Sequence, residues 1–289
     1  MTIASPGPAE AAVLAELAPT FQVRHVDVLG GTLRVLEGGD GPPIVLVHGR
    51  GGAATSWGPL LPALARRGRV LAVDLPGFGA SRGHRFDGGG VEAALDFFVA
   101  PLEAWLLSER IVAPAVVGHS LGGLVALEIA LRRRVAPRAL VPIAPMGTGP
   151  EVALAARLFF RAGPERLSRA LGPSLFARIT GASGPHDAAL SYELHAVRGG
   201  RPDATLAFDT LLPLVGPAPH RRDRLASIDV PALVIGGDHD PVFPAPLAIA
   251  AAAALPRGAV HIEPSGHSPH ADAPARVLTI VDAFLAAHS

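Results

Sequence analysis

Short, wholly apolar runs alternate with longer stretches of helical periodicity along most of this chain. A strand covered on both faces carries apolar side chains on both, so each such run predicts a buried strand. The runs lie at residues 44–47, 69–73, 111–117, 139–144, 232–235 and 259–262. The helical patterns that follow them lie at residues 57–66, 91–108, 121–134, 245–254 and 273–287. This alternation predicts an α/β fold built on a doubly wound, mostly parallel sheet.

The beginning of the chain does not follow this alternation. Residues 21–28 and 32–36 read as two strands that meet at Gly30 and Gly31, which predicts a hairpin. Residues 4–20 are rich in Ala and Pro and predict a frayed stretch with one short helix.

The pattern changes again between residues 145 and 227. Continuous apolar runs stop there, and helical periodicity interrupted by Gly and Pro takes their place. The helical patterns lie at residues 151–161, 164–179, 188–197 and 204–214. We therefore expect a helical cap of residues 146–227 inserted into a core domain of residues 1–145 and 228–289.

The composition of the chain excludes several kinds of site and favours no charged partner. The chain has 289 residues, no cysteine, and 25 basic against 25 acidic residues. Disulfides and thiolate metal sites are excluded, and the balanced charge favours neither nucleic acid nor an anionic membrane as partner. No signal peptide and no apolar stretch long enough to span a bilayer are visible. These features predict a cytoplasmic protein. They do not exclude a small molecule as its partner, and they leave its oligomeric state open.

The central motif is Gly-x-Ser-x-Gly at residues 118–122, between a predicted strand and a predicted helix. This is the pattern of a nucleophile elbow. A chain that turns at once from strand into helix needs glycines at Gly118 and Gly122, where side chains would collide with neighbouring backbone. The turn would lift the hydroxyl of Ser120 clear of the sheet and aim the amide of Leu121 at the same space.

A serine nucleophile needs a histidine base with a carboxylate behind it. The loops after the last two predicted strands supply both kinds of side chain, in the order acid and then base. The acid candidates are Asp238 and Asp240. The base candidates are His267 and His270, of which His270 begins the final helical pattern. No histidine pair has the spacing of a zinc site.

Together these motifs resemble the α/β-hydrolase superfamily, from about residue 21 to the end of the chain. The resemblance rests on residues 48–52 (His-Gly-Arg-Gly-Gly), 74–81 (Asp-Leu-Pro-Gly-Phe-Gly-Ala-Ser) and 118–122, with the paired loops around Asp240 and His267. The serine, acid, base order is the order of that family. The resemblance is specific for fold and machinery, and unspecific for substrate.

The resemblance implies a role for each of these residues. Ser120 would be the nucleophile, Asp240 the acid and His267 the base. The backbone amides of Arg50 and Leu121 would form the oxyanion hole. The resemblance implies no cofactor and no metal.

The predicted activity is hydrolysis of a small to medium carboxylic ester, or of a lactone or thioester, through an acyl-enzyme. Ser120 argues against the branches of the family whose nucleophile is Asp. A carbon–carbon bond hydrolase and a cofactor-free haloperoxidase would use the same triad and stay open. A ligand-binding receptor with this fold but without turnover is the alternative of another class. Arg50 stands where the family often has an apolar residue, and we expect its side chain to face solvent.

Overall fold

The computed structural model describes residues 5–150, 158, 169–170, 172, 175, 185–215 and 220–288. Within these residues, eight strands form one sheet in the order β1-β2-β4-β3-β5-β6-β7-β8. β1 pairs with β2, and β2 with β4, in antiparallel fashion, and all other neighbours are parallel. The strands are β1 Phe21–Val28, β2 Gly31–Gly38, β3 Pro43–Val47, β4 Arg69–Val73, β5 Ala115–His119, β6 Ala139–Ile143, β7 Ala232–Gly237 and β8 Gly258–Glu263.

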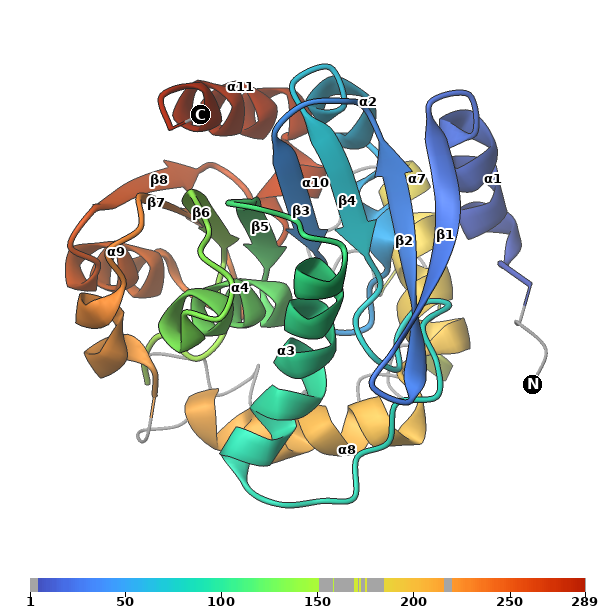
Figure 1. Ribbon diagram of the computed structural model, residues 1–289, viewed down its shortest axis with the longest axis horizontal. Helices are drawn as coiled ribbons and strands as arrows, with labels where there is room; N and C mark the ends of the chain where they lie inside the picture. Colours follow the sequence, from blue (N-terminus) through green and yellow to red (C-terminus); the bar gives the residue numbers. More distant parts are fainter. Residues whose placement is uncertain are drawn as a thin grey trace.

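Helices cover both faces of the sheet (Figure 1). One face packs against α3 Val91–Ser108, α4 Leu121–Arg132 and α9 Ala245–Ala254. The other packs against α1 Pro8–Leu17, α2 Leu61–Leu64 and α11 Pro274–Ala286. Two apolar cores therefore lie on either side of β3 and β5, whose side chains are buried on both faces.

Further helices lie between β6 and β7. They are α7 Pro185–Tyr192, the π-helix η2 Glu193–Arg198, α8 Pro202–Leu211, and the 3₁₀-helices η3 Leu212–Val215 and η4 Arg222–Ser227. α8 runs along the lower edge of the view, next to α3 (Figure 1). The predicted helices at residues 151–161 and 164–179 lie almost wholly outside the described residues.

The strand register decides which loops meet. Val47, the last residue of β3, pairs with Gly118 of β5, so the loop at residues 48–52 leaves the sheet beside the Gly-x-Ser-x-Gly turn. Gly237 of β7 pairs with Glu263 of β8, so the two loops that follow these strands are also neighbours. Parallel strands thus bring the loops after β3, β5, β7 and β8 to one edge of the sheet.

The predicted fold class and hairpin are confirmed, but two local predictions are wrong. Residues 57–66 form no single helix: the 3₁₀-helix η1 (Ala54–Trp57) and the short α2 replace it. Pro59 and Pro62 have no N–H, so the i→i−4 hydrogen-bond ladder breaks twice. The short helix predicted at the start of the chain is present as α1, but it is not frayed, since it is docked on the core with its Glu10 side chain fully buried.

Candidate active site

Ser120 occupies the turn between β5 and α4 in a backbone conformation that side-chain-bearing residues rarely adopt. Its φ is 53° and its ψ is −111°. A Cβ on Gly118 would lie 2.1 Å from the carbonyl oxygen of Gly122, and one on Gly122 would lie 2.0 Å from that of Val47. Both glycines are therefore required by backbone contact. The Ser120 carbonyl accepts hydrogen bonds from two amides, at 3.1 and 3.0 Å, which hold the turn.

His267 and Asp240 meet across the loops that follow β8 and β7. Nδ1 of His267 lies 2.8 Å from Oδ2 of Asp240, and the carboxylate is buried. The other carboxylate oxygen accepts the amides of Val242 at 2.7 Å and Phe243 at 2.9 Å. Since Nδ1–H donates to the carboxylate, Nε2 is the ring nitrogen that can accept a proton.

The rival side chains make other contacts. Asp238 accepts the amide of Ser265 at 3.0 Å and pairs with the exposed ring of His239. His270 lies in the short helix α10 (Pro269–Asp272), is fully buried, and does not contact Asp240 in the described part of the chain. The structure thus brings His267, and not His270, to a carboxylate.

A column of aromatic rings lies against His267. Trp57 packs on His270 with ring centroids 4.6 Å apart, His270 on His119 at 4.6 Å, and His119 on His267 at 4.9 Å. Nε2–H of His119 donates to the carbonyl oxygen of His267 at 2.9 Å. Because His119 precedes Ser120 directly, this contact brings His267 to the elbow. Among the described residues, no hydrogen bond joins the Ser120 hydroxyl to His267.

Burial keeps the two inner histidines neutral. Burial, with a smaller effect of the neighbouring His267, lowers the pKa of His270 to about 3. Burial, with His270 and His267 nearby, holds the pKa of His119 well below its usual value. At neutral pH neither ring places a positive charge beside His267.

His48 fixes the loop at residues 48–52. Its Nε2 accepts the amide of Leu75 at 2.9 Å, so its proton is on Nδ1, which donates to the carbonyl of Gly49 at 2.6 Å. Burial lowers the pKa of His48 to about 4, which preserves this neutral tautomer. A Cβ on Gly49 would lie 3.2 Å from Cβ of Ser120, so the loop lies against the nucleophile candidate.

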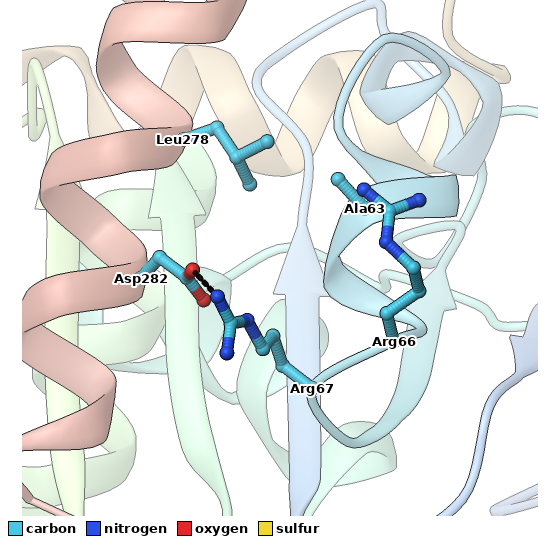
Figure 2. Close-up of a pocket in the computed structure, with 5 residues that line it drawn as sticks. All are labelled: Ala63, Arg66, Arg67, Leu278 and Asp282. Carbon is cyan, nitrogen blue, oxygen red and sulfur yellow. Dashed lines mark ion pairs between the residues drawn. The ribbon is translucent and has the colours of Figure 1, made fainter.

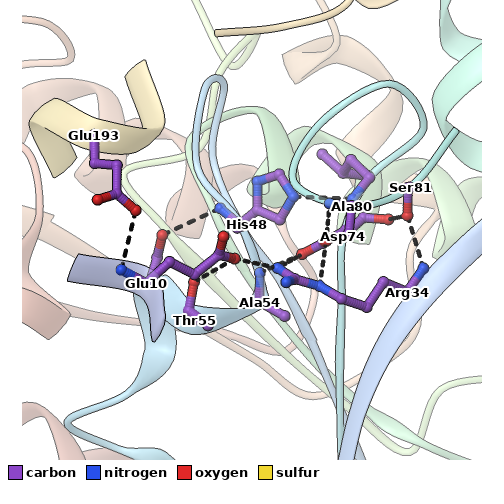
Figure 3. Close-up of polar contacts among 12 residues, drawn as sticks. Glu10, Arg34, His48, Ala54, Thr55, Asp74, Ala80, Ser81 and Glu193 are labelled. Carbon is purple, nitrogen blue, oxygen red and sulfur yellow. Dashed lines mark hydrogen bonds and ion pairs between the residues drawn. The ribbon is translucent and has the colours of Figure 1, made fainter. Parts of the chain in front are cut away.

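A buried ion-pair network holds the backbone just after the same loop, at Ala54 (Figure 3). Arg34 pairs with Glu10 at 2.6 Å and with Asp74 at 2.6 Å, and all three side chains are almost completely buried. Asp74 in turn accepts the amides of Ala54 at 2.6 Å and Ala80 at 2.7 Å. Burial alone would raise the pKa of Asp74, but the Arg34 charge, with smaller contributions from His48 and the Ala54 amide, holds it below its usual value.

Arg50 does not face solvent as expected. Its guanidinium carbon lies 4.8 Å from the ring centroid of Phe208 in α8, and the residue is half-buried. The cation therefore packs on an aromatic face of the segment between β6 and β7. Leu121, the other residue predicted to supply an oxyanion amide, is the first residue of α4, where backbone N–H groups point along the helix axis.

Sequence reasoning missed Glu10 completely. Its partner Arg34 is 24 residues away, and a Glu in an Ala-rich stretch without a clear apolar face carries no local signal of burial. The burial of Arg34 could not be predicted either, because a charged residue within a strand usually faces water.

Other features of the surface lie apart from these residues. A hollow between α2 and α11 is lined by Ala63, Arg66, Arg67, Leu278 and Asp282, with an ion pair of 2.6 Å between Arg67 and Asp282 (Figure 2). It contains none of the candidate site residues. In the described part of the chain, no cluster of three His, Asp or Glu side chains is arranged to hold a metal ion. None of the described helices combines the length and apolar character needed to cross a bilayer.

Comparison with known proteins places this chain in a family. Residues 44–280 match the model of the alpha/beta hydrolase family. An uncharacterized protein of Mycobacterium tuberculosis is 32% identical over 285 residues, covering 92% of this chain and 81% of that protein. The fold is similar to carboxylesterase CesB of Bacillus subtilis (TM-score 0.77, 20% identity, 96% of this chain and 95% of that one). It is also similar to the enol-lactonase of Burkholderia xenovorans LB400 (TM-score 0.72, 20% identity, 91% and 100%). The predicted family is confirmed: the chain belongs to the α/β hydrolases.

Proposed function

We propose that this protein is a serine hydrolase that cleaves a small to medium carboxylic ester, lactone or thioester through an acyl-enzyme. The observation that carries the proposal is the 2.8 Å contact between His267 and a buried Asp240 carboxylate, beside a serine at an elbow with φ of 53°. The similarity in fold to a carboxylesterase and an enol-lactonase agrees with this substrate class.

In the proposed cycle, Oγ of Ser120 attacks the carbonyl carbon while Nε2 of His267 takes the hydroxyl proton. The backbone amides of Arg50 and Leu121 stabilise the oxyanion. The tetrahedral intermediate collapses as His267 returns the proton to the leaving alkoxide. Water, deprotonated by the same ring, then releases the acid. The hydrogen bond from Ser120 to such a base commonly tightens only when substrate is bound.

We also propose that residues 146–227 act as a cap over this site. The packing of Arg50 on Phe208 supports this, because it joins a residue of the oxyanion loop to a helix of that segment. Substrate would then reach Ser120 between the segment and the carboxyl edge of the sheet.

The first test is the loss of the nucleophile. Ser120→Ala should lower kcat for a p-nitrophenyl ester by about 10⁶ and abolish covalent labelling by a fluorophosphonate. Ser108→Ala, an exposed serine at the end of α3, is the matched control and should behave as wild type. If wild type takes no label at Ser120, the protein is a binder of the same fold rather than a hydrolase.

A substrate panel separates the remaining chemistries. p-Nitrophenyl esters of graded chain length and simple lactones should be hydrolysed, whereas a vinylogous diketone should not. Faster turnover of the diketone than of every ester would reassign the protein to carbon–carbon bond hydrolysis. Ser120→Ala run beside each substrate shows which activities depend on the proposed nucleophile.

A further inference from the structure

Two side chains of the π-helix η2 form hydrogen bonds to separate parts of the core. π-Helical turns are rare and often occur at functional sites. Leu194, the second residue of η2, is buried against Ala53, directly after the loop at residues 48–52. The residues on either side of it, Glu193 and His195, make long-range polar contacts in two different directions.

Glu193 fastens η2 to the N-terminal helix. Its carboxylate accepts the amides of Ala9 at 2.8 Å and Glu10 at 3.0 Å, at the start of α1. The N-cap residue of α1, Gly7, has no side chain to cap the helix, and a Cβ there would lie 2.3 Å from Cδ of Glu193. Glu193 therefore caps α1 from 183 residues away, where a carboxylate also meets the positive end of the helix dipole.

α1 is itself anchored to the buried ion-pair network. Its Glu10 pairs with the buried Arg34, which pairs with Asp74, and Asp74 holds the amide of Ala54. A chain of hydrogen bonds and ion pairs thus links η2, through α1, to Ala54 immediately after the 48–52 loop (Figure 3).

His195 contacts that loop directly. Its Nε2 lies 2.8 Å from the carbonyl oxygen of Arg50, and its Nδ1 lies 2.8 Å from the carbonyl oxygen of Ser191. The ring packs on Gly51, whose φ is +73° and where a Cβ would lie 2.4 Å from Cδ2 of His195. The imidazole therefore needs a glycine at this position to reach the Arg50 carbonyl.

We propose that His195 is a positioning residue: its hydrogen bond to the Arg50 carbonyl sets the orientation of the Arg50 backbone, including the amide assigned above to the oxyanion hole. The proposal rests on the proposed function. The peptide planes on either side of Arg50 share its Cα, so fixing the plane that holds the carbonyl fixes that Cα and leaves the amide only rotation about the two backbone bonds of Cα. An oxyanion donor works only if it is held in place before the charge develops.

Two amide variants separate the two contacts of His195. In His195→Gln the side-chain nitrogen reaches the place of Nε2 and can donate to Arg50. In His195→Asn it reaches only the place of Nδ1, toward Ser191. Both variants are polar, uncharged and smaller than an imidazole, so each controls for the other in packing and stability.

We expect His195→Asn to lower kcat for a short p-nitrophenyl ester by about 10- to 100-fold, with KM within about twofold of wild type. His195→Gln should stay within about threefold of wild type in kcat. The rate of fluorophosphonate labelling should follow kcat, because phosphonylation also needs the oxyanion donors. Equal kcat in Asn, Gln and wild type, or a rise in KM with kcat unchanged, would overturn the proposal.

Hydrogen exchange tests the same contact without turnover. The amides of residues 49–53 should exchange at least about tenfold faster in His195→Asn than in His195→Gln, because the peptide planes lose their restraint. Equal exchange in the two variants would overturn the positioning role. Absence of labelling at Ser120 in wild type would overturn the proposed function instead, so the two failures are distinguishable.

Discussion

The two sides of Ser120 are built from opposite kinds of interaction. On the side of the 48–52 loop, which we call the charged side, the backbone is held by the Arg34 ion pairs to Glu10 and Asp74. On the side of His267, the histidine side, the neighbours His119 and His270 are neutral rings, and the Asp240 carboxylate is the charged group that contacts His267 within the described part of the chain.

The difference matches the roles proposed for the two sides. Backbone amides that stabilise an oxyanion must not move, and a buried, fully paired cation holds its partners in one arrangement. A base must gain and lose a proton, and a second cation near it would oppose the gain. On the histidine side, burial keeps His119 and His270 uncharged, while Asp240 is placed to balance the imidazolium that would form on His267 in the proposed cycle.

The largest expected effect is on the histidine side. Asp240→Asn should lower kcat by about 10⁴, because the amide no longer holds Nδ1–H of His267 in the productive tautomer. Asp238→Asn, two residues earlier, should cost less than about tenfold. Steady-state kinetics on one ester measures both. A larger loss in Asp238→Asn would move the acid to Asp238.

The next effect is on stability and belongs to the charged side. Arg34→Leu leaves the carboxylates of Glu10 and Asp74 buried without a cation, and should lower the free energy of unfolding by about 3–5 kcal/mol. Arg24→Leu breaks ion pairs to Glu37 and Glu109 that are partly exposed, and should cost no more than about 1 kcal/mol. Urea unfolding measures both; similar losses would show that burial of the network is unimportant.

Acid should weaken the fold through its buried neutral histidines. The folded pKa values of about 4 for His48 and about 3 for His270 lie below the usual 6.5, so the unfolded chain takes up protons first. Their stabilising contribution is complete above about pH 6.5 and is lost as the pH falls toward 4 and 3.

Each of these histidines should remove about 2 kcal/mol of stability between pH 6.5 and pH 5. His270→Phe should reduce that pH dependence by this amount, while His239→Phe, at an exposed position, should leave it unchanged. Urea unfolding at the two pH values is the measurement. An unchanged slope in His270→Phe would mean that this ring is not neutral in the fold.

The smallest effect concerns Arg50, a cation at the outer edge of the charged side. A double-mutant cycle with Arg50→Ala and Phe208→Leu should give a coupling free energy of about 0.5–1 kcal/mol, the usual strength of a cation–π contact near the surface. A coupling of zero would mean that the guanidinium contributes charge and no packing. Comparing KM for an anionic and a neutral ester in Arg50→Ala then shows whether that charge also meets substrate.

The two sides also differ in how far they could be predicted. Asp240 and His267 stand in short loops after strands, where chain order and turn residues indicate their place. The partners of Arg34 and Glu193 carry no such indication, because they lie up to 184 residues away and their burial depends on how α1 docks. The single helix predicted at residues 57–66 is absent for a local reason, the two prolines within it. This reason is visible in the sequence itself.

By itself the sequence determined the strand–turn–helix with Gly118 and Gly122, since backbone atoms approach there to about 2 Å of any added Cβ and only glycine can follow the turn. It also determined the alternation of buried strands and helices, because apolar side chains on both faces of a strand leave few other folds open. Only the tertiary structure decided which carboxylate meets His267, which histidines lose their charge, and that Glu193 and His195 bind across the molecule. Those outcomes depend on distances between segments and on exclusion of water, and neither quantity is a property of any one stretch of chain.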